Sequence, residues 1–241
     1  MNAVGVIGQV WRYPVKSLVG EQLTAVDVDR RGVTGDRLWA VTDPDGKLGS
    51  GKSSRRFRRM DGLLQLTASV ERDDLVPTIL LPDGRRRAAD DLDVDGLLSE
   101  HVGRPVRLRA ERDVPHHDDG PLHLVTTSSL AAAADEHGGE VRVARLRPNL
   151  VLDTPDLVGL VEDRWVGRTL AIGPELVVRV RDVMPRCIMV DQAQIGLPTD
   201  GRLLDTLGRL NGASLGVVAD VVQPGRVRVD DRVVLGVRDG T

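Results

Sequence analysis

The chain has 241 residues, a formal net charge of -3 and only 2% aromatic residues. A sequence with neither a basic surplus nor many aromatic rings lacks the charge and the stacking surface that nucleic acid requires, so no nucleic-acid partner is expected. No apolar run approaches the roughly 20 residues of a membrane-spanning helix, and the first residues lack the pattern of a signal peptide. Together with the single cysteine, these features favour a cytoplasmic protein without a membrane span.

The N-terminal half is predicted to consist of short strands joined by turns. Alternating apolar residues predict strands over residues 4–11, 22–29, 37–42, 63–70 and 78–81. Tight turns are expected at Asp43-Pro-Asp-Gly46 and at Pro82-Asp-Gly84, because these residues supply the backbone angles that such turns need.

Helices are predicted in three places, at residues 94–101, 128–137 and 202–210, each ending close to a glycine. The tail is predicted to form strands over 214–222 and 226–237, with a turn at Pro224-Gly225. The expected fold class is therefore mainly β with a few helices (α+β). Short strands between frequent turns favour a barrel or a sandwich over a doubly wound sheet.

The polar stretch 111–120 is the predicted domain boundary. It contains His116-His-Asp-Asp119, and imidazole and carboxylate groups are common ligands of zinc and iron. Adjacent residues of an extended chain point in opposite directions, however, so a solvated loop is the favoured interpretation.

Residues 46–53, Gly-Lys-Leu-Gly-Ser-Gly-Lys-Ser, match the phosphate-binding loop of nucleoside triphosphatases. That motif works only with a helix directly behind the loop, and residues 54–60 have no apolar stripe. We therefore expect no nucleoside triphosphatase, and we retain Lys52 as a candidate anion contact on a loop.

The only cysteine, Cys187, follows the strand-like run over residues 176–183. A free cysteine most often packs as a small hydrophobic residue. Arg181 and Arg186 lie nearby and would favour a thiolate, the form that binds metal or attacks an electrophile. Both interpretations stay open on this segment alone.

Four ordered segments together resemble a known family: Tyr13-Pro-Val-Lys-Ser17, Gly35-Asp-Arg-Leu-Trp39, Arg147-Pro-Asn149 and Pro185-Arg-Cys187. They are similar to the MOSC family, named for the C-terminal domain of molybdenum cofactor sulfurase, together with its N-terminal β-barrel companion domain. The resemblance implies an N-terminal β-barrel-like domain over residues 1–110 and a MOSC β-barrel domain over residues 111–241.

Better understood enzymes of this family, such as the mitochondrial amidoxime-reducing component, hold a pterin-based molybdenum cofactor and reduce N-hydroxylated compounds. The resemblance thus implies a cofactor of the molybdopterin type, independent of pyridoxal phosphate, with molybdenum bound by the Cys187 thiolate. The remaining cofactor contacts that it implies are Lys16, Ser17, Arg37, Asp118, Ser129, Arg147 and Asn149, to which the loop residue Lys52 is added as an anion contact.

The implied activity is an oxidoreductase reaction on a small N-hydroxylated substrate. A chain with one cysteine cannot hold a four-thiolate iron–sulfur cluster, so the electrons are expected from a separate donor of ferredoxin, flavin reductase or cytochrome type. Asp191, four residues after the cysteine, is a candidate proton donor or a group that supports the metal ligand from behind, and a solvated turn carboxylate is the alternative interpretation.

Two other functions remain open on the same residues. Cys187 could carry a persulfide as a sulfur carrier or sulfurtransferase, or the site could deliver molybdenum cofactor to another enzyme. A structural or interaction protein would instead leave the cysteine buried and the basic residues without a ligand.

Overall fold

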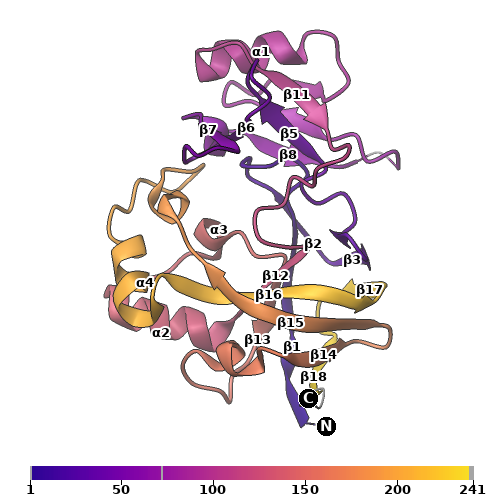
Figure 1. Cartoon of the computed structure of the whole chain (residues 1–241), viewed down its shortest axis with the longest axis vertical. Coiled ribbons are helices and arrows are strands. Elements are labelled where there is room, and N and C mark those ends of the chain that lie inside the picture. The colour runs from indigo at the N-terminus through magenta and orange to yellow at the C-terminus, as the bar shows by residue number, and fades with distance from the viewer. Residues whose placement is uncertain (1, 72, 239–241) are drawn as a thin grey trace.

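Seven strands close into a barrel in the computed structural model, which describes residues 2–71 and 73–238 (Figure 1). Round the barrel the order is β13, β12, β16, β15, β14, β18 and β1, and the pairing of β1 with β13 closes the ring. These strands are β1 (Asn2–Arg12), β12 (Leu122–Thr126), β13 (Leu150–Asp153), β14 (Arg168–Ile172), β15 (Leu176–Pro185), β16 (Ser214–Gln223) and β18 (Arg232–Arg238). The mainly β fold class with a few helices (α+β) is confirmed.

Alternation along the strands fills the barrel. In β15, Leu176, Val178 and Val180 are completely buried, whereas Arg179 and Arg181 between and after them are exposed. Successive side chains of a strand point to opposite faces, so this period of two sends the apolar residues inward. The sequence pattern thus determines which face of each strand forms the core.

A smaller unit above the barrel has its own core, built around Val15, Leu18, Leu66, Ile79 and Leu98. Two sheets form it, with strand orders β11–β5–β6–β7 and β10–β9–β8. Their strands are β5 (Trp39–Thr42), β6 (Leu48–Ser50), β7 (Phe57–Arg59), β8 (Thr67–Ser69), β9 (Thr78–Leu80), β10 (Arg86–Ala88) and β11 (Arg107–Ala110). Helix α1 (Val94–Val102) lies at the top of the unit in Figure 1.

Three further helices belong to the barrel unit: α2 (Thr127–His137), α3 (Val143–Leu146) and α4 (Leu203–Asn211). Helices α2 and α4 lie together at the left of the barrel in Figure 1 and pack against it through a separate cluster that includes Ala133, Leu207 and Leu215. The helices expected near residues 94–101, 128–137 and 202–210 are confirmed, and each ends at a glycine with left-handed backbone angles.

Three strand predictions need correction because tertiary pairing breaks the runs. Residues 22–29 form two strands in different sheets, β2 (Glu21–Leu23) against β1 and β3 (Ala25–Asp29) against β4 (Gly32–Val33) and β17 (Gly225–Arg228). The run 226–237 divides into β17 and β18, with Asp230 at φ 70° between them. The run 63–70 begins as a 3₁₀ helix, Leu63–Gln65, because Gly62 turns the chain at φ 95°.

The two units are linked by the chain that leaves β1. This strand belongs to the barrel, and the residues that follow it enter the upper core through Val15 and Leu18. The domain boundary after residue 110 stays a prediction, with β1 on its N-terminal side contributing to the barrel. Among the described residues, no helix combines the length and the apolar character needed to cross a membrane.

Candidate functional site

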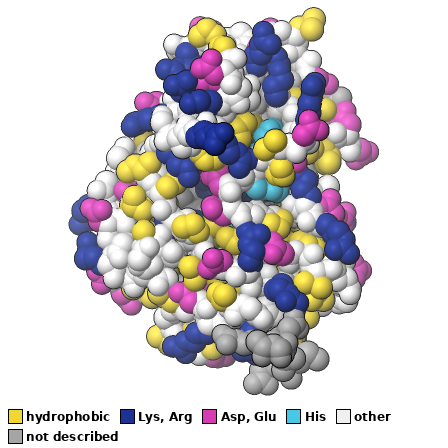
Figure 2. All heavy atoms as spheres, in the orientation of Figure 1, with side chains coloured by type: hydrophobic (Ala, Val, Ile, Leu, Met, Phe, Trp, Pro, Cys, Tyr) yellow, Lys and Arg dark blue, Asp and Glu magenta, His cyan; other side chains and the backbone are white. Residues whose placement is uncertain are grey.

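A polar cavity of about 200 Å³ lies where the barrel meets the upper unit. In Figure 2, histidine, cationic and acidic side chains gather at this waist of the molecule. Eight of the ten predicted site residues line the cavity: Lys16, Ser17, Arg37, Lys52, Asp118, Arg147, Asn149 and Cys187. The segments that carry the family resemblance therefore converge on one site.

Most of these residues lie in loops that adjoin the ends of strands. Lys16 and Ser17 follow β1, Arg37 precedes β5, and Arg147 lies just before β13. Cys187 lies two residues after the end of β15. Rigid strands thus hold short loops whose side chains point to a common space, a frequent way to build a site.

Three of these loop residues have left-handed backbone angles that side chains other than glycine rarely adopt: Ser17 at φ 64°, Arg37 at φ 50° and Arg147 at φ 54°. Such a conformation costs on the order of 1 kcal/mol or more and persists where the surroundings impose it. All three residues line the same cavity. The surrounding structure therefore holds their backbone in an unfavourable conformation that places their side chains at the cavity wall.

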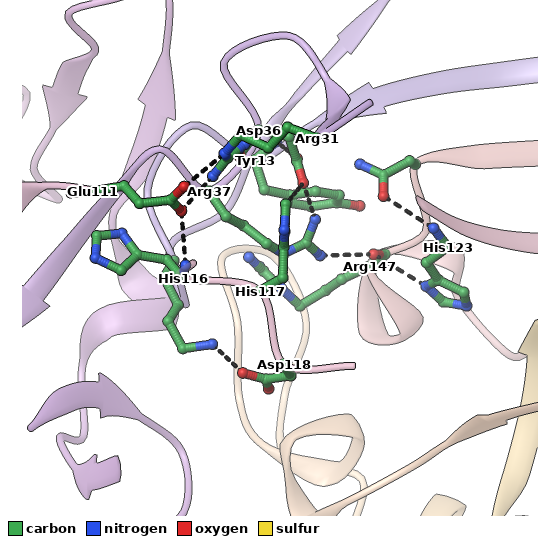
Figure 3. A network of polar contacts seen from close by, with 12 residues as sticks. Tyr13, Arg31, Asp36, Arg37, Glu111, His116, His117, Asp118, His123 and Arg147 are labelled. Carbon is green, nitrogen blue, oxygen red and sulfur yellow. Dashed lines mark hydrogen bonds and ion pairs between the residues drawn. The ribbon is translucent and has the colours of Figure 1, made fainter. Parts of the chain in front are cut away.

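Positive charge dominates the cavity wall. Six lining residues are cationic, namely Lys16, Arg37, Lys52, Arg145, Arg147 and Arg186, and two are acidic, namely Asp118 and Asp119. Lys16 forms an ion pair with Asp118, and Arg37 forms one with the buried Asp36 (Figure 3). Arg147 is buried and Arg186 is half-buried, and no carboxylate within the described residues forms an ion pair with either guanidinium group; acidic side chains act on them only at longer range.

Burial acts directly on these cations. It lowers the pKa of Lys16 to about 8, although Asp118 acts in the opposite direction. Burial also lowers the pKa of Arg147 to about 10 and that of Arg186 to about 9. Desolvation disfavours the charged form of these groups, and a bound anion would offset that effect. The cavity is therefore suited to an anionic ligand.

The Tyr13 ring contacts two of the guanidinium groups. Its centroid is 4.9 Å from Cζ of Arg37 and 4.4 Å from Cζ of Arg147. Arg37 Nη2 also donates a hydrogen bond to the carbonyl oxygen of Arg147, at 3.3 Å. Each of the two like charges therefore gains a cation–π contact with the same ring.

His123 was not among the predicted site residues, yet it organises the barrel side of the cavity. Its Nε2 accepts a hydrogen bond from Arg186. Its Nδ1 lies 3.3 Å from the carbonyl oxygen of Arg147 (Figure 3). This pattern requires a neutral ring with the proton on Nδ1. Burial, reinforced by the Arg186 charge, lowers the pKa of His123 well below its ordinary value. No residue near His123 in the sequence indicates this role.

Cys187 is partly exposed and lines the cavity beside Met184 and Met189. Arg186 precedes it and is anchored by donation to the carbonyl oxygens of Leu146, at 2.8 Å, and Leu215, at 2.9 Å. The only thiol of the chain is therefore accessible from the cavity and adjacent to a fixed cation.

The structure places two predicted site residues elsewhere. Ser129 is buried at the start of α2, where its Oγ donates to Glu162 at 2.5 Å. Asp191 is buried four residues after the cysteine. Its Oδ1 accepts hydrogen bonds from the amides of Leu203, at 2.8 Å, and Leu204, at 3.2 Å, which are the first residues of α4. Neither side chain lines the cavity. Ser129 instead binds a buried acid, and Asp191 binds the free amides at a helix N-terminus.

The segment 116–119 crosses the waist in an extended form. Burial lowers the pKa of His117 to about 4 and also lowers that of His116, so both rings are neutral near pH 7. Within the described ranges no group of three or more histidine, cysteine or acidic side chains is arranged to hold a metal ion. Asp118 is the member of this segment that reaches a site cation.

The residues of the cavity fit a molybdenum cofactor of the molybdopterin type. Nη2 of Arg147 is buried and has no hydrogen-bond partner among the described residues, as expected of a donor that waits for an anionic ligand. Ser17 donates to the carbonyl oxygen of Gly49 at 3.0 Å, which leaves its oxygen free to accept a hydrogen bond. Cys187 offers the soft sulfur ligand that molybdenum would require.

The fold is a β-barrel joined to a smaller β unit, with a cationic, thiol-bearing cavity between them. Residues 111–234 match the MOSC domain, and residues 4–79 match the MOSC N-terminal beta barrel domain. The chain belongs to the MOSC family, and its function is related to the molybdenum cofactor.

Two relatives are mitochondrial proteins. The chain is 24% identical to mitochondrial amidoxime-reducing component 1 of Homo sapiens, covering 98% of this chain and 84% of that protein. It is also 24% identical to mitochondrial amidoxime reducing component 2 of Bos taurus, covering 78% and 67%. The crystal structure of the YUAD protein from Bacillus subtilis is similar in fold, with a TM-score of 0.51 at 17% identity over 98% of this chain and 95% of that one.

Proposed function

We propose that this protein is a molybdenum-cofactor-dependent reductase of N-hydroxylated compounds that receives electrons from a separate donor protein. One observation carries the proposal: Arg147 and Arg186, neither of which has a carboxylate partner in an ion pair within the described residues, meet the only thiol of the chain in one cavity, and Arg147 keeps a buried donor without a partner. Both mitochondrial relatives are named for the reduction of amidoximes, which supports the substrate class.

Each part of the cofactor finds suitable side chains. Lys16, Arg147 and Arg186 would neutralise its anionic phosphate end, with Arg147 Nη2 as the free donor. Ser17 would accept a hydrogen bond from the pterin, and Cys187 would bind molybdenum as thiolate. Asn149 acts through the backbone instead, because its side chain bridges the amide of His123 and the carbonyl oxygen of Trp11.

The net reaction breaks one N–O bond and consumes two electrons and two protons. The oxygen leaves as water, and the reduced nitrogen compound is released. When bound, the cofactor supplies two-electron redox chemistry at a metal that accepts oxygen. The chain itself fixes the cofactor through the buried cations, and it holds Asp118 and Lys16 as a proton-bearing pair at the cavity wall.

Activity with an artificial electron donor tests the proposal. The chain is purified from a host that makes the cofactor and is mixed with reduced viologen dye and an aromatic amidoxime. We expect two dye molecules oxidised for each amidine formed, and no amidine from Cys187→Ser. A fully molybdenum-loaded wild type that forms no amidine would refute the reductase function. Cyanide-labile sulfur on Cys187 in a protein without metal would support the sulfur-carrier alternative.

A further inference from the structure

A second cavity, of about 480 Å³, lies beside the first and is named here the groove. One wall comes from residues 59–65 of the upper unit, and the other comes from residues 188–201 of the loop that follows Cys187. Its volume falls within the range of small-molecule sites. Two segments far apart in the sequence thus form a cleft that neither unit could build alone.

The groove differs chemically from the cationic cavity. Met60, Leu63, Leu64 and Ile188 give it apolar walls. Its charged residues are already occupied: Arg59 forms an ion pair with Asp61 at 2.9 Å, and the carboxylate of Asp191 accepts the amides of α4. A neutral ligand with an apolar body fits such a surface better than an anion.

The groove and the cationic cavity are contiguous. Ser17 lines both, and Ile188 on the groove wall directly follows Cys187 on the cavity wall. On the opposite side, Gly51 of the groove directly precedes Lys52 of the cavity. A molecule lying in the groove can therefore present one end to the cavity.

Two wall residues are available to a ligand. Ile188 is 45% exposed despite its size, so an apolar ligand would remove a large hydrophobic side chain from water. The half-buried Gln65 side chain makes no hydrogen bond within residues 2–71 and 73–238, and its amide can therefore bind a polar group. The groove combines apolar contact with uncharged hydrogen-bonding groups, of which Ser17 and Gln65 lie on the side of the upper unit.

We infer that the groove binds the neutral, apolar body of the substrate and presents the N–O end to the cavity at Ser17. This inference rests on the proposed function and adds a subsite to it: the groove takes the uncharged aryl or alkyl body of a ligand whose polar end reaches the cavity. Compounds without such a body make no use of the groove.

The methionine methyl groups can show which of the two spaces a ligand occupies, because different methionines line each one. Met60 lines the groove, whereas Met184 and Met189 line the cavity. The full chain is labelled with ¹³C at the methionine methyl groups, and benzamidoxime is added without an electron donor. We expect a saturable shift of the Met60 resonance, which Met60→Leu assigns. Shifts confined to Met184 and Met189, or no shift at all, would overturn the inference.

Substrate discrimination provides a second test with a matched control. Ile188→Ser removes the exposed apolar wall, and Ile195→Ser removes a side chain of similar exposure, 48%, that does not line the groove. We expect the ratio of kcat/KM for benzamidoxime to that for hydroxylamine to fall about tenfold in Ile188→Ser. Ala193→Phe, which fills the groove, should lower the same ratio, and Ile195→Ser should leave it unchanged.

The outcomes separate the two proposals. An equal loss on both substrates in Ile188→Ser, at unchanged molybdenum content, would contradict substrate binding in the groove. A wild type that reduces neither compound would refute the reductase function, and the Met60 resonance would still decide whether the groove binds an apolar amidoxime.

Discussion

Lys16 and Asp118 form an ion pair that joins residues 102 positions apart in the sequence. The pair ties the loop after β1 to the segment that crosses the waist of the molecule, and both partners line the cationic cavity. The lysine side chain is almost completely buried, while the aspartate retains access to water. The pair therefore carries a desolvation cost that falls mainly on the lysine.

This burial predicts how stability changes with pH. Because the pKa of Lys16 is lowered to about 8 from 10.5, the unfolded chain binds more protons than the folded chain between these values. The free energy of unfolding should therefore rise with pH, by on the order of 1 kcal/mol between pH 7.5 and 9.5. Urea unfolding of cofactor-free protein measures it. Equal slopes in wild type and Lys16→Met would show that another group is responsible.

Arg147→Met is expected to weaken cofactor binding and to stabilise the cofactor-free protein. Removing a buried cation with an unsatisfied donor should stabilise the cofactor-free protein by about 1 kcal/mol, after allowance for the lost contact with Tyr13. The same change should lower cofactor occupancy. Thermal unfolding and metal analysis on one preparation check both. A destabilised variant with full occupancy would show that Arg147 serves the fold.

Asp191 is predicted to act as a helix cap. Asp191→Ala should lower the free energy of unfolding by about 1 kcal/mol, because the first amides of α4 lose their acceptor. Asp191→Asn should retain most of the stability, since an amide oxygen can accept the same bonds. Equal losses in the two variants would argue against capping.

Ser129 is predicted to support the buried acid Glu162, whose pKa is raised by burial and lowered again in part by hydrogen bonds from Ser129 and Thr126. Ser129→Ala should cost about 1–2 kcal/mol of stability. The bound molybdenum should stay at the wild-type level, because the side chain does not line the cavity. If Ser129→Ala lost molybdenum while its stability stayed unchanged, Ser129 would contribute to cofactor binding and not to the fold.

Local patterns predicted much of the fold. The alternation in β1 and the alanine-rich α2 with its terminal Gly138 were sufficient, because their signals lie within the element. The division at Thr24 was not predictable from the residues, since it depends on β2 and β3 pairing with different partners.

The site was predictable only where motifs carried it. Lys16, Arg37, Arg147 and Cys187 meet as the family resemblance implied. Ser129 and Asp191 lie outside the cavity wall because their hydrogen-bond partners, Glu162 and the amides of α4, hold them elsewhere, and these partners are distant in sequence. The groove had no sequence signature, because it arises where two units meet.

The most direct test of cofactor binding is the molybdenum and pterin content of protein purified from a host that makes the cofactor. Wild type is compared with Cys187→Ser, and Ser129→Ala serves as the control outside the cavity. We predict near-stoichiometric molybdenum in wild type and control, and a sharp loss of metal in Cys187→Ser. A folded wild type that contains neither molybdenum nor pterin, or a Cys187→Ser variant that retains full metal, would contradict thiolate binding of a molybdenum cofactor in this cavity.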